Sequence, residues 1–238
     1  RFPDLLRRVG GYNIDALITK DPNMSHLLVG SEGTLAFFQQ IHLNLQPLPR
    51  HKTLGICHFP TFYAAMDATQ HIVKLKPSAV ELVDRTMINL ARDIPMFKAT
   101  VNQFVVGEPE ALLLVEFSGE NEEAQLSSLR DLVTLMNDMG FVDAVVEATD
   151  LTFQQAVWEV RKQGLNIMMS MKGDGKPVSF IEDCAVDLKD LAEYTRRLTE
   201  VFYKHGTEGT FYAHASVGCL HVRPILNMKE ETGASKMR

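Results

Sequence analysis

Hydrophobic residues recur with strand or helix spacing along most of the chain from residue 53 onward. Short apolar runs alternate with stretches in which apolar residues return every three or four positions, the period of an amphipathic helix. The clearest helical stretch, Asn121 to Met139, is followed by Gly140, a residue that commonly ends helices. The pattern predicts strands at 53–59, 79–83, 111–117, 142–147 and 178–186, and helices at 61–75, 85–91, 121–139, 152–169 and 188–205.

The order of these elements predicts an α+β fold, with a ferredoxin-like antiparallel sheet that helices cover and a duplicated split βαβ unit as one option. Pro47-Leu48-Pro49 separates this unit from the preceding residues, because proline cannot donate to a strand ladder and favours an extended linker. Before it we expect the end of a helix at Asp4 to Val9 and an apolar strand that continues to Leu45. The predicted parts are a remnant of another domain at 1–50, the main domain at 51–225, and the start of a helix at 226–238.

Composition narrows the classes of function. The chain has 238 residues, 45% hydrophobic and 23% charged, which is enough for a substantial core. A net charge of −6 gives no broad attraction for nucleic acid or anionic lipid. No apolar run approaches the roughly 20 residues that span a bilayer. The three scattered cysteines, Cys57, Cys184 and Cys219, favour a reducing compartment, so we expect a cytoplasmic location.

Two histidines flank a predicted hairpin near the end of the chain. Residues 210–214 and 219–222 are rich in strand formers, and Val217-Gly218 can form a two-residue loop between them. In that register His214 lies directly opposite His221, with Cβ atoms roughly 4.5–5.5 Å apart. Two neutral imidazoles at that separation can bind one divalent metal, although two ligands do not complete a zinc or manganese shell. The alternative is a hairpin whose histidines only pack.

Other candidates lie in a turn, on a helix and in a strand. The glycines of Gly30-Ser31-Glu32-Gly33-Thr34 let the backbone pass close to another molecule, and a purely structural turn is the alternative. Arg161, three residues after Trp158 on a predicted helix, can hold a carboxylate with two charge-assisted hydrogen bonds or can be solvated. Glu182 and Asp183 interrupt an apolar strand, so one of them should point inward and either orient an imidazole or cap the next element.

These motifs, together with Leu28-Val29 before the turn, occur in an order that resembles FAD-linked oxidases of the vanillyl-alcohol-oxidase type. That family includes D-lactate dehydrogenases, the flavin subunit of glycolate oxidase and D-2-hydroxyglutarate dehydrogenase, and the resemblance covers essentially all of the chain. The family's hairpin reads His-x-Gly-Asp-Gly-Asn-Leu-His, and here Val217 and Cys219 replace the aspartate and the asparagine. This variant resembles most the branch that is fused to an iron–sulfur half. Cys219 is either a soft metal ligand or a small packed thiol.

The resemblance implies a role for each candidate. Arg161 would hold the substrate carboxylate, and His214 and His221 would bind a divalent metal, zinc or manganese, that orients the substrate. Any iron–sulfur cluster would lie outside this chain. The residues of the turn would contact FAD, namely Gly30, Ser31, Glu32, Gly33 and Thr34.

The resemblance therefore predicts a fragment of an FAD-dependent dehydrogenase that oxidises a D-2-hydroxy acid and passes electrons to a downstream acceptor, with membrane association only through that partner. We expect the fragment to be inactive alone and to hold FAD weakly or not at all. Nothing before Gly30 resembles a glycine-rich pyrophosphate loop, and the chain ends before a further metal-site acid of the family. The competing class is a non-catalytic ferredoxin-like interaction module, which gains support if Arg161 points away from His214 and His221.

Overall fold

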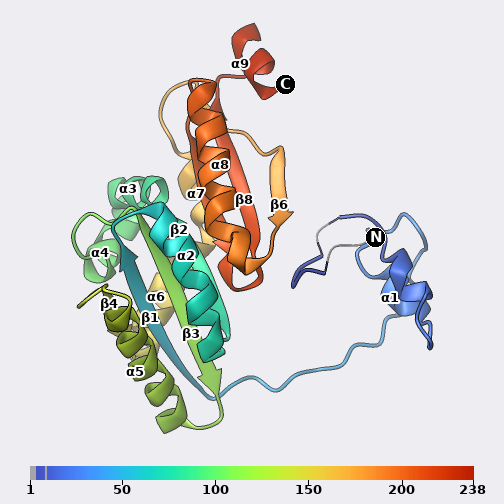
Figure 1. Ribbon diagram of the computed structural model, residues 1–238, viewed down its shortest axis with the longest axis horizontal. Helices are drawn as coiled ribbons and strands as arrows, with labels where there is room; N and C mark the ends of the chain where they lie inside the picture. The colour runs from blue at the N-terminus through green and yellow to red at the C-terminus, as the bar shows by residue number, and fades with distance from the viewer. Residues whose placement is uncertain (1–3, 9) are drawn as a thin grey trace.

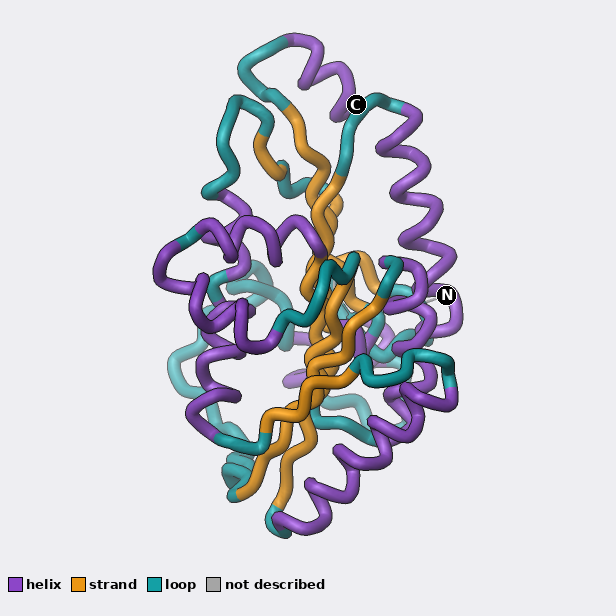
Figure 2. The backbone as a smooth tube through the Cα atoms, turned by 90° about the vertical axis from the view of Figure 1, so that its left-hand side faces the viewer, coloured by secondary structure: helices purple, strands orange, loops and turns teal. Residues whose placement is uncertain are grey.

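The computed structural model describes residues 4–8 and 10–238. Its strands form one eight-stranded antiparallel sheet. The order is β4-β1-β3-β2-β7-β8-β5, and β6 also pairs with β8. Figure 2 shows this sheet on edge, with helices on both sides. The strands are β1 His51–Phe59, β2 Ala79–Asp84, β3 Ala111–Gly119, β4 Val145–Ala148, β5 Lys176–Pro177, β6 Ile181–Ala185, β7 Gly209–His214 and β8 Cys219–Leu226.

The α-helices between the first and last strands connect the strands and cover the sheet, whereas the first helix lies apart from it (Figure 1). Several begin within one residue of the predicted starts, and there Thr61, Asn121 and Asp150 each accept a hydrogen bond from a backbone N–H in the first helical turn. Gly140 follows the longest of them with a positive φ of 87°. The helices are α1 Met24–Leu28, α2 Phe62–Ile72, α3 Arg85–Asp93, α4 Pro95–Phe104, α5 Glu122–Asp138, α6 Leu151–Lys162, α7 Gly164–Met169, α8 Leu191–Lys204 and α9 Glu231–Met237.

The topology confirms the ferredoxin-like prediction. Strands β1 to β4, connected by α2 and α5, have the order β4-β1-β3-β2. The two strands of each βαβ unit are not neighbours, because an antiparallel strand of the other unit lies between them. The arrangement then recurs in part, because β6 and β7 both pair with β8, and α8 connects them. The second unit extends the first sheet through the pairing of β2 with β7.

Alternation of side chains along the central strands produces two hydrophobic cores, one on each face of the sheet. On β1, Cys57 and Phe59 pack with α2, α5 and α8, whereas Leu54 and Ile56 pack with α3, α4, α6 and α7. On this second face, β7 and β8 carry mostly polar side chains, of which Tyr212, His214, His221 and Arg223 are half-buried. The polar end of this face carries the candidate site.

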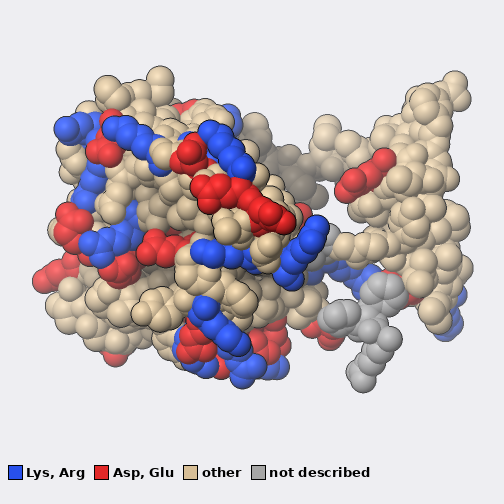
Figure 3. Space-filling model, turned by 90° about the horizontal axis from the view of Figure 1, so that it is seen from above, with Lys and Arg blue, Asp and Glu red and all other residues tan. Residues whose placement is uncertain are grey.

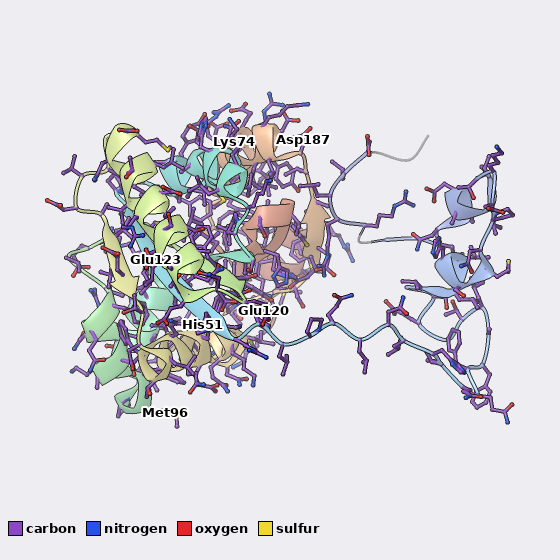
Figure 4. The ribbon with its side chains drawn as sticks, turned by 90° about the horizontal axis from the view of Figure 1, so that it is seen from below. His51, Lys74, Met96, Glu120, Glu123 and Asp187 are labelled. Atoms are coloured by element: carbon purple, nitrogen blue, oxygen red, sulfur yellow. The ribbon has the colours of Figure 1, made fainter. Side chains whose placement is uncertain are left out.

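The chain before β1 differs from the prediction. Residues 36–45 form no strand, and Phe37 and Leu45 are 93% and 90% exposed. A strand needs a neighbour to pair its backbone groups, and no described strand lies beside this segment, which reaches His51 as an extended connection (Figure 1, Figure 4). Residues 4–8 are not helical, and Val9 lies outside the described residues.

Two other predicted elements differ in detail, and one helix was not predicted. The helix expected at 152–169 is interrupted at Gln163 between α6 and α7. The strand expected at 178–186 is shorter than predicted, because only β6, at Ile181–Ala185, lies within that range. Helix α4 was not expected. No described helix is long and apolar enough to cross a membrane. On the face shown in Figure 3, Lys and Arg side chains are interspersed with Asp and Glu, in keeping with a net charge of −6.

Candidate functional site

The histidine hairpin has a longer turn than predicted. Residues 215–217 form a 3₁₀ turn and Gly218 adopts a φ of 65°, so that β8 begins at Cys219. His214 is therefore paired with Cys219, and the predicted pairing of His214 with His221 is wrong by two residues.

The two histidines nevertheless meet. Side chains alternate with a period of two along a strand, so a register difference of two residues keeps His221 on the same face as His214. The two residues are diagonal neighbours, and their ring centroids lie 5.3 Å apart with the rings nearly perpendicular. The predicted proximity is confirmed.

A carboxylate holds the Nδ1 atom of each histidine. His214 Nδ1 lies 2.8 Å from Glu81 Oε1, and His221 Nδ1 lies 3.0 Å from both Glu182 Oε2 and Asp183 Oδ1. Because an ionised carboxylate only accepts hydrogen bonds, Nδ1 carries the proton in each ring. This tautomer leaves the Nε2 lone pair of each histidine available to a metal ion.

An arginine in turn pairs with each glutamate. Arg161 Nη2 on α6 lies 2.7 Å from Glu81 Oε2, and Arg223 Nε on β8 lies 2.7 Å from Glu182 Oε1. Both arginine side chains are only 12% exposed. The site therefore contains two arginine–carboxylate–histidine chains, and Arg161 lies beside the histidines rather than in bulk solvent.

Tyr212 lies between these two chains. Its ring stacks on His221 at 4.4 Å, and the guanidinium carbons of Arg161 and Arg223 lie 5.2 Å and 5.6 Å from the ring centroid. Arg223 Nη2 also donates to the Tyr212 hydroxyl at 3.1 Å. Burial raises the pKa of the Tyr212 phenol, so its proton stays in place at neutral pH.

Arg161 keeps donors for a further partner. Its Nε is buried and has no hydrogen-bond acceptor among the described residues. Trp158, one helical turn earlier, does not enter the site, because its indole N–H donates to Glu116 Oε2 at 3.0 Å. The predicted carboxylate-binding residue thus faces the histidines with unused hydrogen-bonding capacity.

Cys219 and Asp183 join His221 in a compact group. One ligand atom from each side chain lies within 4.8 Å of the others. Asp183 sits in an irregular part of β6, where the register against β8 shifts and its φ is 53°. The Cys219 side chain is buried, and this burial raises the pKa of its thiol. The negative charge of Asp183 raises that pKa further.

The predicted cofactor turn is a well-defined loop. Gly30 and Gly33 have φ values of 77° and 76°, and Thr34 N donates to Ser31 O at 2.9 Å. Ser31 is 2% exposed, and its Oγ has no partner among the described residues. Gly30 and Glu32 also line a cavity of about 470 Å³ together with Asp183, so the turn borders the same space as one residue of the histidine site.

Three residues of the site were missed from sequence: Glu81, Tyr212 and Arg223. Glu81 is the single charge within the apolar strand from Ala79 to Val83, and that pattern could have indicated an inward carboxylate. Alternation along β8 places Arg223 on the same face as His221, so the period-two rule could have found it.

Comparison with known proteins identifies a family for this chain. The family model described as FAD linked oxidases, C-terminal domain, matches residues 48–238. D-2-hydroxyglutarate dehydrogenase of Haemophilus influenzae is 29% identical over 95% of this chain and 23% of its own length. D-lactate dehydrogenase of Archaeoglobus fulgidus is 30% identical over 86% of this chain and 42% of its own length. The chain spans about a quarter of the length of the first of these relatives.

Solved structures share the fold. One of alkyldihydroxyacetonephosphate synthase aligns with a TM-score of 0.55 over 90% of this chain and 43% of that chain, at 17% identity. One of p-cresol methylhydroxylase with substrate bound aligns with a TM-score of 0.56 over 81% and 42%, at 11% identity. At these identities the likeness concerns the architecture alone.

Proposed function

Because the chain belongs to the family of FAD linked oxidases, C-terminal domain, we propose that it is the substrate-binding part of an FAD-dependent dehydrogenase that oxidises a D-2-hydroxy acid. The observation that carries this proposal is the convergence of Arg161, His214 and His221 on one face of the sheet. We assign residues 51–225 to the substrate domain, 1–50 to the end of an FAD-binding domain and 226–238 to a following helix.

The turn at residues 30–34 fits a role in binding FAD. Its two glycines adopt left-handed backbone conformations, and the buried Ser31 Oγ lacks a partner within the described chain. Gly30, Ser31, Glu32, Gly33 and Thr34 would therefore contact the cofactor. When bound, FAD would supply an acceptor for the hydride from C2 of the substrate.

The histidine site fits a divalent metal. Glu81 and Glu182 fix the Nδ1 protons, and the two Nε2 atoms of His214 and His221 would hold zinc or manganese. Arg161 would orient the substrate carboxylate through donors that Glu81 does not use. The ordinary role of such a metal is to polarise a bound oxygen.

The electrons would pass from the flavin to a downstream acceptor, and any iron–sulfur cluster would lie outside this chain. A cytoplasmic location remains part of the proposal, on the basis of few and scattered cysteines. The competing class, a non-catalytic interaction module, has less support, because Arg161 is 12% exposed and lies beside the histidines.

Substitution of Arg161 by lysine in the complete flavoprotein tests the substrate role. Lysine keeps the charge next to Glu81 but cannot form a two-pronged contact with a carboxylate. We expect kcat/KM for the D-2-hydroxy acid to fall about 10- to 100-fold, equivalent to the roughly 1.5–3 kcal/mol of a charged hydrogen bond. Arg197→Lys, at a 72% exposed position on α8, is the control. Equal activity of the two variants would contradict the assignment.

Substitution of Glu81 by glutamine tests the metal role in the 238-residue chain by isothermal titration with Zn²⁺ and Mn²⁺. The loss of the charge that holds His214 Nδ1 should lower metal affinity about 10- to 100-fold. Glu147→Gln, at an exposed position of β4, is the control. A wild-type chain that binds neither ion would remove the metal from the proposal.

A further inference from the structure

Cys219 is almost fully buried, at 1% exposure, yet it belongs to neither hydrophobic core of the described residues. Its neighbours along β8, Leu220 and Val222, pack into the core beneath α2, α5 and α8. Cys219 lies on the opposite face of the sheet, paired with His214 and close to Asp183. The surroundings of the thiol are thus those of the polar site and not those of a small packed hydrophobic residue.

We propose that Cys219, Asp183 and His221 form a mixed sulfur, oxygen and nitrogen site, in which the Cys219 thiolate is a metal ligand. This inference rests on the proposed function and specifies the metal as one with affinity for thiolate, zinc above all.

The distances suit such a site. Ligand atoms of the three side chains lie within 4.8 Å of one another. In a tetrahedral zinc site, with Zn–S about 2.3 Å and Zn–N or Zn–O about 2.0–2.2 Å, neighbouring ligand atoms lie about 3.3–3.7 Å apart. Rotation of the Asp183 and Cys219 side chains toward the Nε2 atom of His221 would close the group around an ion.

The hydrogen bonds at His221 leave Asp183 available. Nδ1 carries one proton but has two carboxylates at 3.0 Å, those of Glu182 and Asp183. Glu182 also pairs with Arg223, which holds it in place. Asp183 can thus turn from the imidazole to a metal ion while Glu182 keeps the orientation of His221.

The chemistry of the thiol sets the selectivity. Binding would exchange the Cys219 S–H bond for a sulfur–metal bond and release the proton to solvent, without oxidation or reduction. A thiolate favours zinc over manganese, which prefers oxygen ligands. The Cys219 site should therefore discriminate between the two ions that the histidines alone would both accept.

Cobalt substitution gives a direct test, because a thiolate bound to Co²⁺ produces an intense charge-transfer absorption in the near ultraviolet, separate from the visible d–d bands. The 238-residue chain, reduced and metal-free, is titrated with Co²⁺ as wild type, Cys219→Ser and Cys184→Ser. Cys184 is a partly buried thiol in β6, adjacent to Asp183, and serves as the matched control. Circular dichroism establishes that each variant is folded, and Cys219→Ala replaces the serine variant if that variant is not.

We expect the charge-transfer band in wild type and Cys184→Ser and its loss in Cys219→Ser or Cys219→Ala. The ratio of zinc to manganese affinity should fall at least about tenfold in the Cys219 variant. Cobalt d–d bands without the charge-transfer band in wild type would overturn the Cys219 assignment and leave the histidine metal site standing. Absence of any cobalt, zinc or manganese binding would overturn both.

Discussion

Replacement of Gly218 by alanine should displace the histidine hairpin from β6. Gly218 has a φ of 65°, and a Cβ atom there would lie 2.1 Å from the carbonyl oxygen of Val186. The left-handed conformation costs a non-glycine residue about 1–2 kcal/mol. Relief of an overlap with backbone typically adds about 1–3 kcal/mol. We therefore expect a loss of about 2–5 kcal/mol in the free energy of unfolding.

Gly206→Ala separates the two contributions. Gly206 has a similar φ of 61°, but the nearest neighbour of an added Cβ would be the flexible Lys236 Nζ at 3.7 Å. This control therefore carries the backbone strain without the overlap, and should lose only about 1–2 kcal/mol. The difference between the variants measures the close approach of Gly218 to Val186.

Urea unfolding followed by fluorescence of Trp158, the single tryptophan, and by circular dichroism gives both free energies. For a chain of this size each kcal/mol corresponds to about 2–4 °C in Tm, so thermal melts provide a second measurement. Equal stabilities of the two variants, within about 0.5 kcal/mol, would refute the claim that the turn is held tightly against β6. A Gly218→Ala variant as stable as wild type would refute the strain as well.

Two further predictions concern buried polar side chains. Asp84→Ala should destabilise the chain by about 2–4 kcal/mol in urea unfolding. The carboxylate accepts hydrogen bonds from the backbone N–H groups of Met87 and Phe211, and both would lose their acceptor. Asp84→Asn retains one acceptor oxygen and should cost less. Burial raises the pKa of Asp84 to about 6, so the native state takes up a proton as pH falls from about 6 to 4. The contribution of Asp84 to the free energy of unfolding should therefore rise as pH falls over that range. This rise should be absent in Asp84→Asn. Burial lowers the pKa of His58, so its contribution to stability is present above about pH 6.5 and is lost as pH falls toward the folded value. The difference in unfolding free energy between pH 7 and pH 5 should therefore change in His58→Gln but not in His42→Gln, at an exposed position; an identical change in both would contradict the assignment.

The sequence was most informative where local pattern and burial agree. The run from Ala111 to Val115 is apolar on both faces because β3 is central and lies between two hydrophobic cores. The segment at 36–45 has a similar apolar character but no strand to pair with among the described residues. Periodicity records which side chains avoid water, and cannot by itself supply the partner that a strand requires.

Breaks between helices depend on tertiary contacts that a single sequence does not display. The predicted helix at 152–169 is interrupted where Gly164 packs against Met87, so closely that a Cβ would lie 2.9 Å from the Met87 methyl carbon. Helix α4 begins at Pro95, directly after α3, and a short apolar stretch with a proline gave no clear period.

The candidate site was partly predictable for a similar reason. The seven-residue separation of His214 and His221 placed both on one face, even though the turn was longer than expected. Glu81 and Arg161 come from elements far apart in sequence, and only the pairing of β2 with β7 and the position of α6 bring them together. Local motifs identify the reactive side chains, and the sheet order identifies their partners.

The pairing of both arginines with glutamates determines how the site would attract an anion. Arg161 and Arg223 contribute two positive charges, whereas Glu81, Glu182 and Asp183 contribute three negative ones. These five side chains together therefore offer a carboxylate no net attraction. A divalent cation would change the net charge of these side chains from −1 to +1, or to zero where Cys219 binds the cation as a thiolate, and in either case the affinity for an anion should depend on prior loading of the metal. Binding would be ordered, with the cation first and the anion second.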